Sequence, residues 1–333
     1  MQSEVDTTAK CAAIVGGGVI GGGWAARFLL HGWQVRVFDP APDAGSKINA
    51  VIENARHALP AIHNNLLPAE GKLVFCSSIA ECVQNATWIQ ESVPERLHIK
   101  QSVLTEIQSH APNSAVLASS TSGFKPSELA AGSTDPKQIL VAHPYNPVYL
   151  LPLVEIVPHA DTDAEIVTQA KSIASSIGMK PVVLKKEIDA HIGDRLLEAL
   201  WREALWLVKD DYASTEEIDD IIRYSFGLRW AQMGLFETYR VAGGEAGMRH
   251  FIGQFAPALH WPWSRLTDVP DLDDALVDKI ATQSDAQSGH HTIRELERLR
   301  DANLTAILEA LKQQDWGAGQ LLNQHDANLK SAD

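Results

Sequence analysis

The sequence predicts an α/β protein in which a doubly wound, mostly parallel sheet is followed by an all-α domain. Apolar, strand-like segments alternate with helix-like segments through the first half of the chain, which is typical of a sheet covered by helices on both faces. Strands are expected at Cys11 to Val15, Gln34 to Phe38, Leu73 to Cys76, Trp88 to Glu91, Val116 to Ala118, Ile139 to Ala142, Val154 to Val157 and Pro181 to Leu184. After the charged stretch 185–187 the apolar residues recur at helical spacing. We therefore expect a sheet domain over residues 1–186 and a helical domain over residues 187–333.

The first strand runs directly into a glycine-rich turn. The run is Gly16-Gly17-Gly18-Val19-Ile20-Gly21, which contains one register of G-x-G-x-x-G. In this motif Gly16 makes the tight turn, Gly18 lets the backbone approach a pyrophosphate, and Gly21 lets the next helix pack on the strand. That helix is expected from Trp24 to His31, and the helix start would bind the anion. The segment predicts a dinucleotide site in a Rossmann-type domain.

An acidic residue ends the second strand. Asp39 stands where a carboxylate can accept hydrogen bonds from both ribose hydroxyls of a dinucleotide. A 2′-phosphate would meet a like charge there, and the residues that follow, Pro40 to Asp43, include no arginine. NAD is therefore the expected cofactor, in preference to NADP. The alternative reading is that Asp39 is only a turn residue before Pro40.

The second half of the chain is expected to consist of amphipathic helices. A long first helix is indicated by an apolar stripe at Ile192, Leu196, Leu200, Leu205 and Val208. Two capping boxes, Ser214 with Glu217 and Thr292 with Glu295, predict later helix starts. We expect the apolar stripes to form core or a dimer interface, not a catalytic site.

The charge of the chain excludes one class of partner. The formal net charge is −14, whereas nucleic-acid binding depends on lysine and arginine, so no nucleic-acid partner is expected. Residues 1–187 hold 14 basic and 17 acidic side chains, and residues 188–333 hold 14 basic and 25 acidic ones. The acidity of the second half either serves solubility or favours a cationic substrate.

Neither a membrane segment nor a metal site is expected. The first ten residues lack the pattern of a secretory signal and no apolar run is long enough to span a membrane, so a cytoplasmic protein is predicted. The three cysteines, Cys11, Cys76 and Cys82, have no C-x-x-C spacing and indicate neither a disulfide framework nor a zinc site. They are interpreted as small buried hydrophobic residues.

A histidine and an acid are the candidates for catalysis. His143 follows a predicted strand, at the edge where open α/β sheets bind their ligands. A histidine can accept the proton of an alcohol near neutral pH while hydride leaves for the cofactor. Glu155 stands in an otherwise apolar strand, where an unpaired charge would be costly. A hydrogen bond from His143 to Glu155 would satisfy the acid and stabilise the imidazolium.

These segments resemble the NAD-dependent 3-hydroxyacyl-CoA dehydrogenases over nearly the whole chain. The segments that carry the resemblance are the glycine run, S-x-T-S at 119–122, H-x-x-N-P at 143–147, L-V-E at 153–155 and the helical second half. The resemblance implies that Ser122, His143 and Glu155 are catalytic, and that Ser122 also contacts the substrate and the nicotinamide.

The resemblance carries further implications for binding and assembly. It implies that Glu95 and Lys100 approach the nicotinamide half of the cofactor and that Asn146 belongs to the substrate site. It also implies a homodimer through the helical domain.

One position departs from the family pattern. Where the family usually has asparagine before Arg-Leu-Leu, this chain has Asp194. An added negative charge near the reacting centre would attract a cation and disfavour a substrate with phosphates. The stretches 143–152, 194–204, 261–263 and 284–287 are similar to a branch of the family that oxidises L-carnitine.

A quaternary ammonium substrate would be held against aromatic faces. Tyr145, beside the histidine, is one candidate for the substrate site, and the tryptophans of the second half are others: Trp201, Trp206, Trp230, Trp261, Trp263 and Trp316. We therefore expect oxidation of a small cationic 3-hydroxy acid. The alternatives are another 3-hydroxy acid, such as L-gulonate or 3-hydroxybutyryl-CoA, and an NAD-binding structural protein without turnover.

Overall fold

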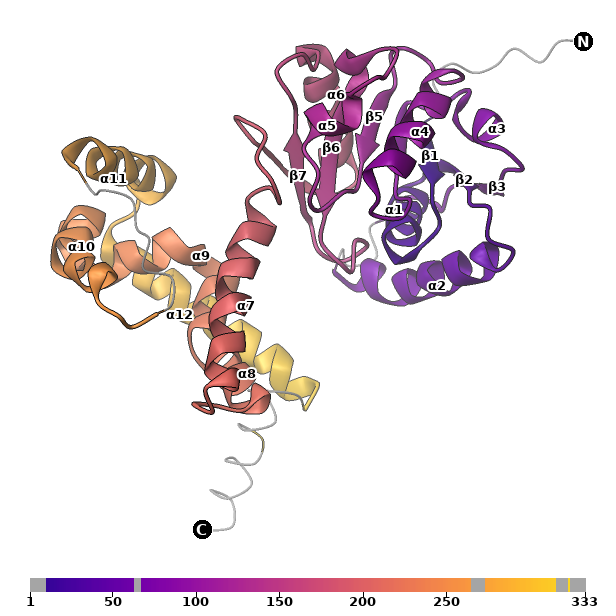
Figure 1. The fold of residues 1–333 in the computed structure, drawn as a ribbon. Helices are drawn as coiled ribbons and strands as arrows, with labels where there is room; N and C mark the ends of the chain where they lie inside the picture. The colour runs from indigo at the N-terminus through magenta and orange to yellow at the C-terminus, as the bar shows by residue number, and fades with distance from the viewer. Residues whose placement is uncertain (1–9, 63–66, 265–272, 316–322, 324–333) are drawn as a thin grey trace, which may run out of the picture. The chain divides into compact units, whose positions relative to one another are not determined.

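The computed structural model of the chain describes residues 10–62, 67–264, 273–315 and 323. The chain divides into two compact units, Met1–Leu196 and Leu197–Asp333 (Figure 1). The domain boundary expected from the sequence, between residues 186 and 187, stays a prediction. Trp316, one of the candidate aromatic residues, lies outside the described residues.

An eight-stranded sheet forms the first unit, with the strands in the order β3-β2-β1-β4-β5-β6-β7-β8. The strands are β1 (Cys11–Val15), β2 (Gln34–Phe38), β3 (Leu73–Phe75), β4 (Trp88–Glu91), β5 (Val116–Ser119), β6 (Ile139–Pro144), β7 (Leu153–Val157) and β8 (Lys180–Val183). All neighbouring strands are parallel except β6 and β7. The prediction of a mostly parallel, doubly wound sheet is confirmed.

Helices cover the sheet on both faces. They are α1 (Val19–Leu30), α2 (Ala44–Ile62), α3 (Ile79–Val83), α4 (Leu97–Gln108), α5 (Pro126–Ala130) and α6 (Ala164–Ser176), with a short 3-10 helix at Pro136–Gln138. Side chains of α1, α2 and α6 pack in one core, and side chains of α3, α4 and α5 pack in the other. In β1, Ala12 and Ile14 face the first core, whereas Ala13 and Val15 face the second. Both faces of the strand are therefore buried, as in other parallel sheets.

Helix α1 begins at Val19, so the predicted start at Trp24 is wrong. Glycine has a low helix propensity, so the run Gly21-Gly22-Gly23 did not indicate a helix, and its first residues could not be predicted from the sequence. Close packing explains the glycines. A Cβ atom at Gly21 would lie 1.9 Å from the carbonyl oxygen of Gly16, and one at Gly23 would lie 2.8 Å from Val148. Tertiary contact thus overrides helix propensity here.

A buried arginine of α1 ties the helix to the segment that follows β6. Arg27 is 1% exposed, and its guanidinium donates to the carbonyl oxygens of Val148 (2.8 Å), Leu151 (3.2 Å) and Ile177 (3.0 Å). Burial lowers the pKa of Arg27 to about 10. The carbonyl oxygen of Gly178, at 3.4 Å, is a fourth acceptor. Because two of the four acceptors, Val148 and Leu151, lie between β6 and β7, Arg27 holds the loop that follows β6 against α1.

The second unit is helical, as predicted. Its helices are α7 (Gly193–Lys209), which begins in the first unit, α8 (Thr215–Tyr224), α9 (Phe226–Ala242), α10 (Gly247–Phe255), α11 (Asp274–Ser288) and α12 (Ile293–Gln313), with 3-10 helices at Gly244–Ala246 and Ala256–His260. Both predicted capping boxes are present at the starts of α8 and α12. None of the described helices is long and apolar enough to cross a membrane.

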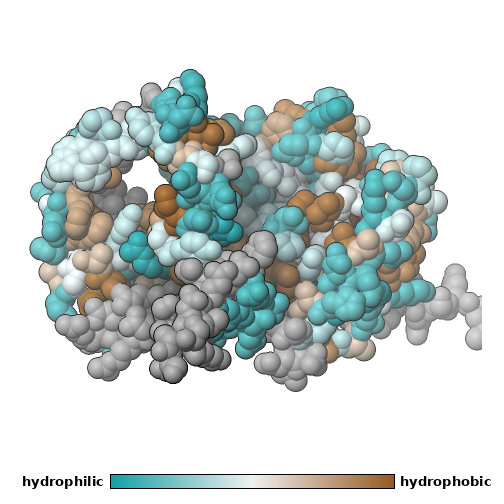
Figure 2. Space-filling model, turned by 90° about the horizontal axis from the view of Figure 1, so that it is seen from below, coloured by the Kyte–Doolittle hydropathy of each residue, from teal (hydrophilic) through white to brown (hydrophobic). Residues whose placement is uncertain are grey.

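The apolar stripe of α7 reaches the surface. Leu196, Leu200 and Leu205 are 60%, 37% and 53% exposed. Figure 2 shows hydrophobic side chains (brown) among hydrophilic ones (teal) on the face of the helical unit seen from below. Within the described part of the chain these leucines are therefore not buried in a core, and the expected homodimer stays a prediction.

Candidate active site

The glycine run forms a turn at the carboxyl end of β1. Gly16 has a φ of 101°, and a Cβ atom there would lie 2.5 Å from the carbonyl oxygen of Ser92. Above Gly18 the space is open, because an added Cβ would meet nothing within 4 Å. The arrangement leaves the backbone of this turn accessible to a pyrophosphate at the start of α1.

A cavity of about 690 Å³ adjoins the turn and includes Asp39 among its lining residues. The carboxylate of Asp39 accepts hydrogen bonds from the backbone N–H groups of Gly17 (2.6 Å) and Ala41 (2.8 Å). The described residues that line the cavity include Asp39 and Glu106 but no lysine or arginine. The lining therefore suits the ribose of NAD and disfavours the 2′-phosphate of NADP.

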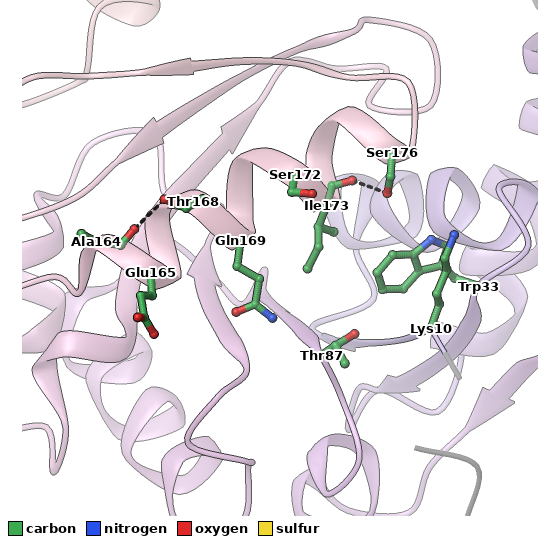
Figure 3. A pocket seen from close by; sticks show the side chains of 10 residues that line it. All are labelled: Lys10, Trp33, Thr87, Ala164, Glu165, Thr168, Gln169, Ser172, Ile173 and Ser176. Carbon is green, nitrogen blue, oxygen red and sulfur yellow. Dashed lines mark hydrogen bonds between the residues drawn. The ribbon is translucent and has the colours of Figure 1, made fainter. Parts of the chain in front are cut away.

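A second hollow, of about 770 Å³, lies along α6 (Figure 3). Its other lining residues, Lys10, Trp33 and Thr87, stand immediately before β1, β2 and β4. These are the amino ends of parallel strands, at the edge of the sheet opposite to the glycine turn. Ligands of open α/β sheets bind at the carboxyl ends, so this hollow is not the candidate active site.

His143 and Glu155 lie opposite one another on β6 and β7. Nδ1 of His143 is 3.0 Å from Oε2 of Glu155, and the two residues are 4% and 3% exposed. A carboxylate at this distance holds the proton of the ring on Nδ1 and leaves Nε2 to accept another. The structure thus brings together the two residues that the sequence singled out.

Glu155 accepts three further hydrogen bonds. The hydroxyl of Tyr145 donates to Oε2 at 3.0 Å, while the backbone N–H groups of Ile192 and Gly193 donate to Oε1 at 3.0 and 3.1 Å. Burial acts to raise the pKa of Glu155, but the hydrogen bonds from His143, Tyr145 and the two backbone groups outweigh it and lower the pKa. Glu155 is therefore a stable anion inside the protein.

Two more titratable residues border the ring of His143. Oδ2 of Asp194, near the start of α7, is 3.7 Å from Nε2 of His143. The ring of His191 lies 5.3 Å from that of His143, and its Nε2 donates to the carbonyl oxygen of Thr121 at 3.1 Å. Burial lowers the pKa of His191, so this ring is neutral. The negative charges on either side of His143 are those of Glu155 and Asp194.

A second buried ion cluster lies between β4 and α4. Nζ of Lys100 is 3.0 Å from Glu91 and 3.2 Å from Glu95, and Lys100 and Glu91 have side chains that are 1% and 0% exposed. Ser119 donates to Glu91 at 2.5 Å, and the hydroxyl of Thr121 donates to Glu95. The cluster therefore joins the S-x-T-S segment to the Ser92 segment that borders the glycine turn.

Other predicted site residues are on the surface of this region. Ser122 and Asn146 are exposed, and neither side chain makes a hydrogen bond within the described part of the chain. Both follow strands, β5 and β6, that end at the same edge as β1. They are accessible to a ligand, and their roles stay predictions.

The sequence reasoning missed two buried polar residues. Glu91 carried the same signal as Glu155, an acid within an apolar strand, and a lysine follows it nine residues later. His191 carried no such signal, because nothing near it in the sequence marks a buried ring. Only the fold places it against His143.

Comparisons with known proteins agree with this geometry. Residues 11–188 match the NAD binding domain of 3-hydroxyacyl-CoA dehydrogenase, and residues 191–279 match the C-terminal domain of the same family. A solved structure described as 5-formyl-3-hydroxy-2-methylpyridine 4-carboxylic acid 5-dehydrogenase, an NAD⁺-dependent dismutase, is 26% identical, with a TM-score of 0.70 over 91% of this chain and 99% of that one.

Two curated relatives are considerably more similar. The L-carnitine dehydrogenase/betainyl-CoA thioesterase of Ruegeria pomeroyi is 63% identical over 96% of this chain, which spans 66% of the length of that relative. The L-carnitine dehydrogenase of Mesorhizobium japonicum is 57% identical over 96% of this chain and 89% of its own length. With both halves of the chain matched, this protein belongs to the 3-hydroxyacyl-CoA dehydrogenase family.

Proposed function

We propose that this chain oxidises the 3-hydroxyl of L-carnitine to 3-dehydrocarnitine with NAD. The observation that carries the proposal is the buried His143–Glu155 pair at the edge of the sheet that also holds the glycine turn. The names of the curated relatives support the choice of substrate. Asp194, 3.7 Å from the ring of His143, adds a negative charge suited to a cationic substrate.

In the proposed oxidation His143 is the base, and Glu155, Ser122 and Asn146 assist it. His143 accepts the hydroxyl proton on Nε2, because its Nδ1 is held by Glu155. As the proton leaves the oxygen, the C3–H bond breaks and a ketone forms; bound NAD supplies the hydride acceptor. Glu155 stabilises the imidazolium that results. Ser122 is proposed to hydrogen-bond the substrate oxygen, and Asn146 to support the same site.

We expect the oxidation rate to rise with pH through the range in which histidines titrate. Only a neutral imidazole can accept the hydroxyl proton, whereas the reverse reaction needs the imidazolium and should slow down over the same range. Glu155, whose pKa is lowered by its hydrogen bonds, stays ionised there and adds no second step. Initial rates in both directions against pH test this, and two flat profiles would contradict it.

Asp194→Asn should weaken the binding of L-carnitine. Removing one negative charge near the trimethylammonium group should raise the KM for carnitine by about tenfold, since a pair of charges a few ångströms apart is worth roughly 1 to 3 kcal/mol at a partly buried site. L-gulonate, which is anionic, should not lose affinity. Asp189→Asn, at a position where the side chain is 71% exposed and paired with Lys125, serves as the control. Equal changes for both substrates would exclude a charge effect.

A panel of substrates tests the function itself. NADH absorbance would be followed with L-carnitine, L-gulonate and 3-hydroxybutyryl-CoA under the same conditions. We expect kcat/KM to be highest for L-carnitine. A higher kcat/KM for L-gulonate or 3-hydroxybutyryl-CoA would show that carnitine is not the preferred substrate, while the proposed alcohol oxidation would stand. No turnover with any of the three would favour a structural NAD-binding protein.

A further inference from the structure

Two neighbouring features of the site fit one another closely. The hydroxyl of Tyr145 occupies the place that a side chain at position 193 would need. A Cβ atom at Gly193 would lie 1.4 Å from Oη of Tyr145 and 2.6 Å from its Cζ. Gly193 has an ordinary backbone conformation at the start of α7, with no positive φ, so backbone freedom does not explain the glycine. Space for the hydroxyl does.

Among the described residues, the hydroxyl that fills this space has one hydrogen-bond partner. It donates to Oε2 of Glu155 at 3.0 Å, the same oxygen that accepts the proton of His143 Nδ1 at 3.0 Å. Burial, and then the charge of Glu155, raise the pKa of Tyr145, so its hydroxyl remains a donor across the working range of an enzyme. Its ring lies 5.0 Å from that of His143 at an angle of 59°.

We infer that Tyr145 is a positioning residue for the His143–Glu155 pair, and that Gly193 is required because it leaves room for the Tyr145 hydroxyl. The inference rests on the proposed role of His143 as the base and deepens it. It reassigns Tyr145 from contact with the ammonium group of the substrate to support of the acid. The hydroxyl of Tyr145 donates its proton to Glu155.

The hydroxyl tunes His143 through the shared oxygen. Oε2 of Glu155 accepts hydrogen bonds from both Tyr145 and His143. The bond from Tyr145 partly neutralises the negative charge on this oxygen and so weakens its attraction for the imidazolium of His143. The titratable groups that face His143 are Glu155 on β7, Asp194 in α7, the neutral ring of His191 and Tyr145 itself. Loss of the hydroxyl should therefore strengthen the bond between the two charged groups, stabilise the protonated form of His143, and loosen the orientation of its ring.

Tyr145→Phe removes the hydroxyl and keeps the ring, so it tests the contribution of the hydroxyl alone. We expect kcat to fall by about fivefold to tenfold, part of the strength of one hydrogen bond to a charged group. The acid limb of the kcat/KM profile should move up by about half a pH unit, and the KM for the substrate should stay unchanged. Tyr239→Phe, which alters a ring stacked on Phe251 in the helical unit, is the matched control. An unmoved limb, or a higher KM with unchanged kcat, would overturn the inference.

Gly193→Ala tests the fit from the other side. Alone it should lower kcat by more than Tyr145→Phe does, because its Cβ displaces the hydroxyl. In Gly193→Ala/Tyr145→Phe the closest clash is gone, and two ring carbons, at 2.6 and 3.3 Å, remain near the new Cβ. The double variant should therefore be more active than Gly193→Ala alone. If the two substitutions lower kcat independently, so that the double variant shows the product of the single effects, the two side chains do not compete for one space. Circular dichroism and NAD titration would show that each variant is folded.

One readout does not need turnover. The titration of His143, followed by NMR and assigned with His143→Asn, should shift upward in Tyr145→Phe and remain in place in Tyr239→Phe. If no substrate of the panel reacts but this shift is found, the proposed function fails while the inference holds. If carnitine is oxidised and the titration does not move, the inference fails while the function holds.

Discussion

His143→Ala is expected to lower kcat for L-carnitine by about 10²- to 10⁴-fold, the usual contribution of a general base. The affinity for NAD should change little, because the cavity at the glycine turn and Asp39, which is proposed to bind the dinucleotide, is not lined by His143. Glu155 loses one hydrogen bond but keeps those from Tyr145, Ile192 and Gly193, so the fold should survive. Stopped-flow measurement of NADH formation, with NAD binding followed by protein fluorescence, gives both quantities.

The chain offers a matched control for this variant. His57 is also paired with a glutamate, Glu53, at 3.3 Å, but its side chain is 79% exposed on α2. His57→Ala removes the same chemical group and should leave kcat as it is. A His143→Ala variant that keeps turnover within tenfold of the wild type would remove this residue from the mechanism.

Lys100→Met should destabilise the first unit by about 3 to 5 kcal/mol, the typical cost of removing one partner of a buried ion pair. Glu91, with a side chain that is 0% exposed, would keep only its bonds to Ser119 and the backbone of Val93. Its negative charge would then be buried without a counter-ion. Urea unfolding, with the midpoint and slope recorded for each transition, measures the loss.

Two further variants make this result specific to charge. Lys47→Met breaks an exposed pair with Asp43, whose side chains are 66% and 57% exposed, and should have a much smaller effect. In Glu91→Gln/Lys100→Met both buried positions are neutral. The double variant should therefore recover part of the unfolding free energy that Lys100→Met loses. If Lys100→Met is no less stable than Lys47→Met, the cluster does not hold the unit together.

The sequence was sufficient to predict the sheet, because its signals are local. Each predicted strand is found within two residues of its expected bounds, as a short apolar run between turn residues. The reversed direction of β7 could also have been derived. Only residues 145–152 connect β6 to β7, fewer than the dozen or so that a parallel crossover requires.

The site was only partly accessible to such reasoning. His143 and Glu155 stand out because each is a polar residue in or beside an apolar strand, and both proved to be partners. The contacts of His191, Tyr145 and Gly193 depend on how segments distant in the sequence fold back on one another. No spacing in the chain encodes them. For the same reason the start of α1 was missed, since the packing that favours glycine there is tertiary.

The antiparallel pairing of β6 with β7 has a consequence for how such a protein can diversify. His143 and Glu155 are cross-strand neighbours, so main-chain ladder bonds, and not loops, set the separation of the imidazole and the carboxylate. Residues of the neighbouring loops can therefore change without altering the separation of the imidazole and the carboxylate. Substrate recognition by these loops can thus diversify on this scaffold while the spacing of the pair is kept.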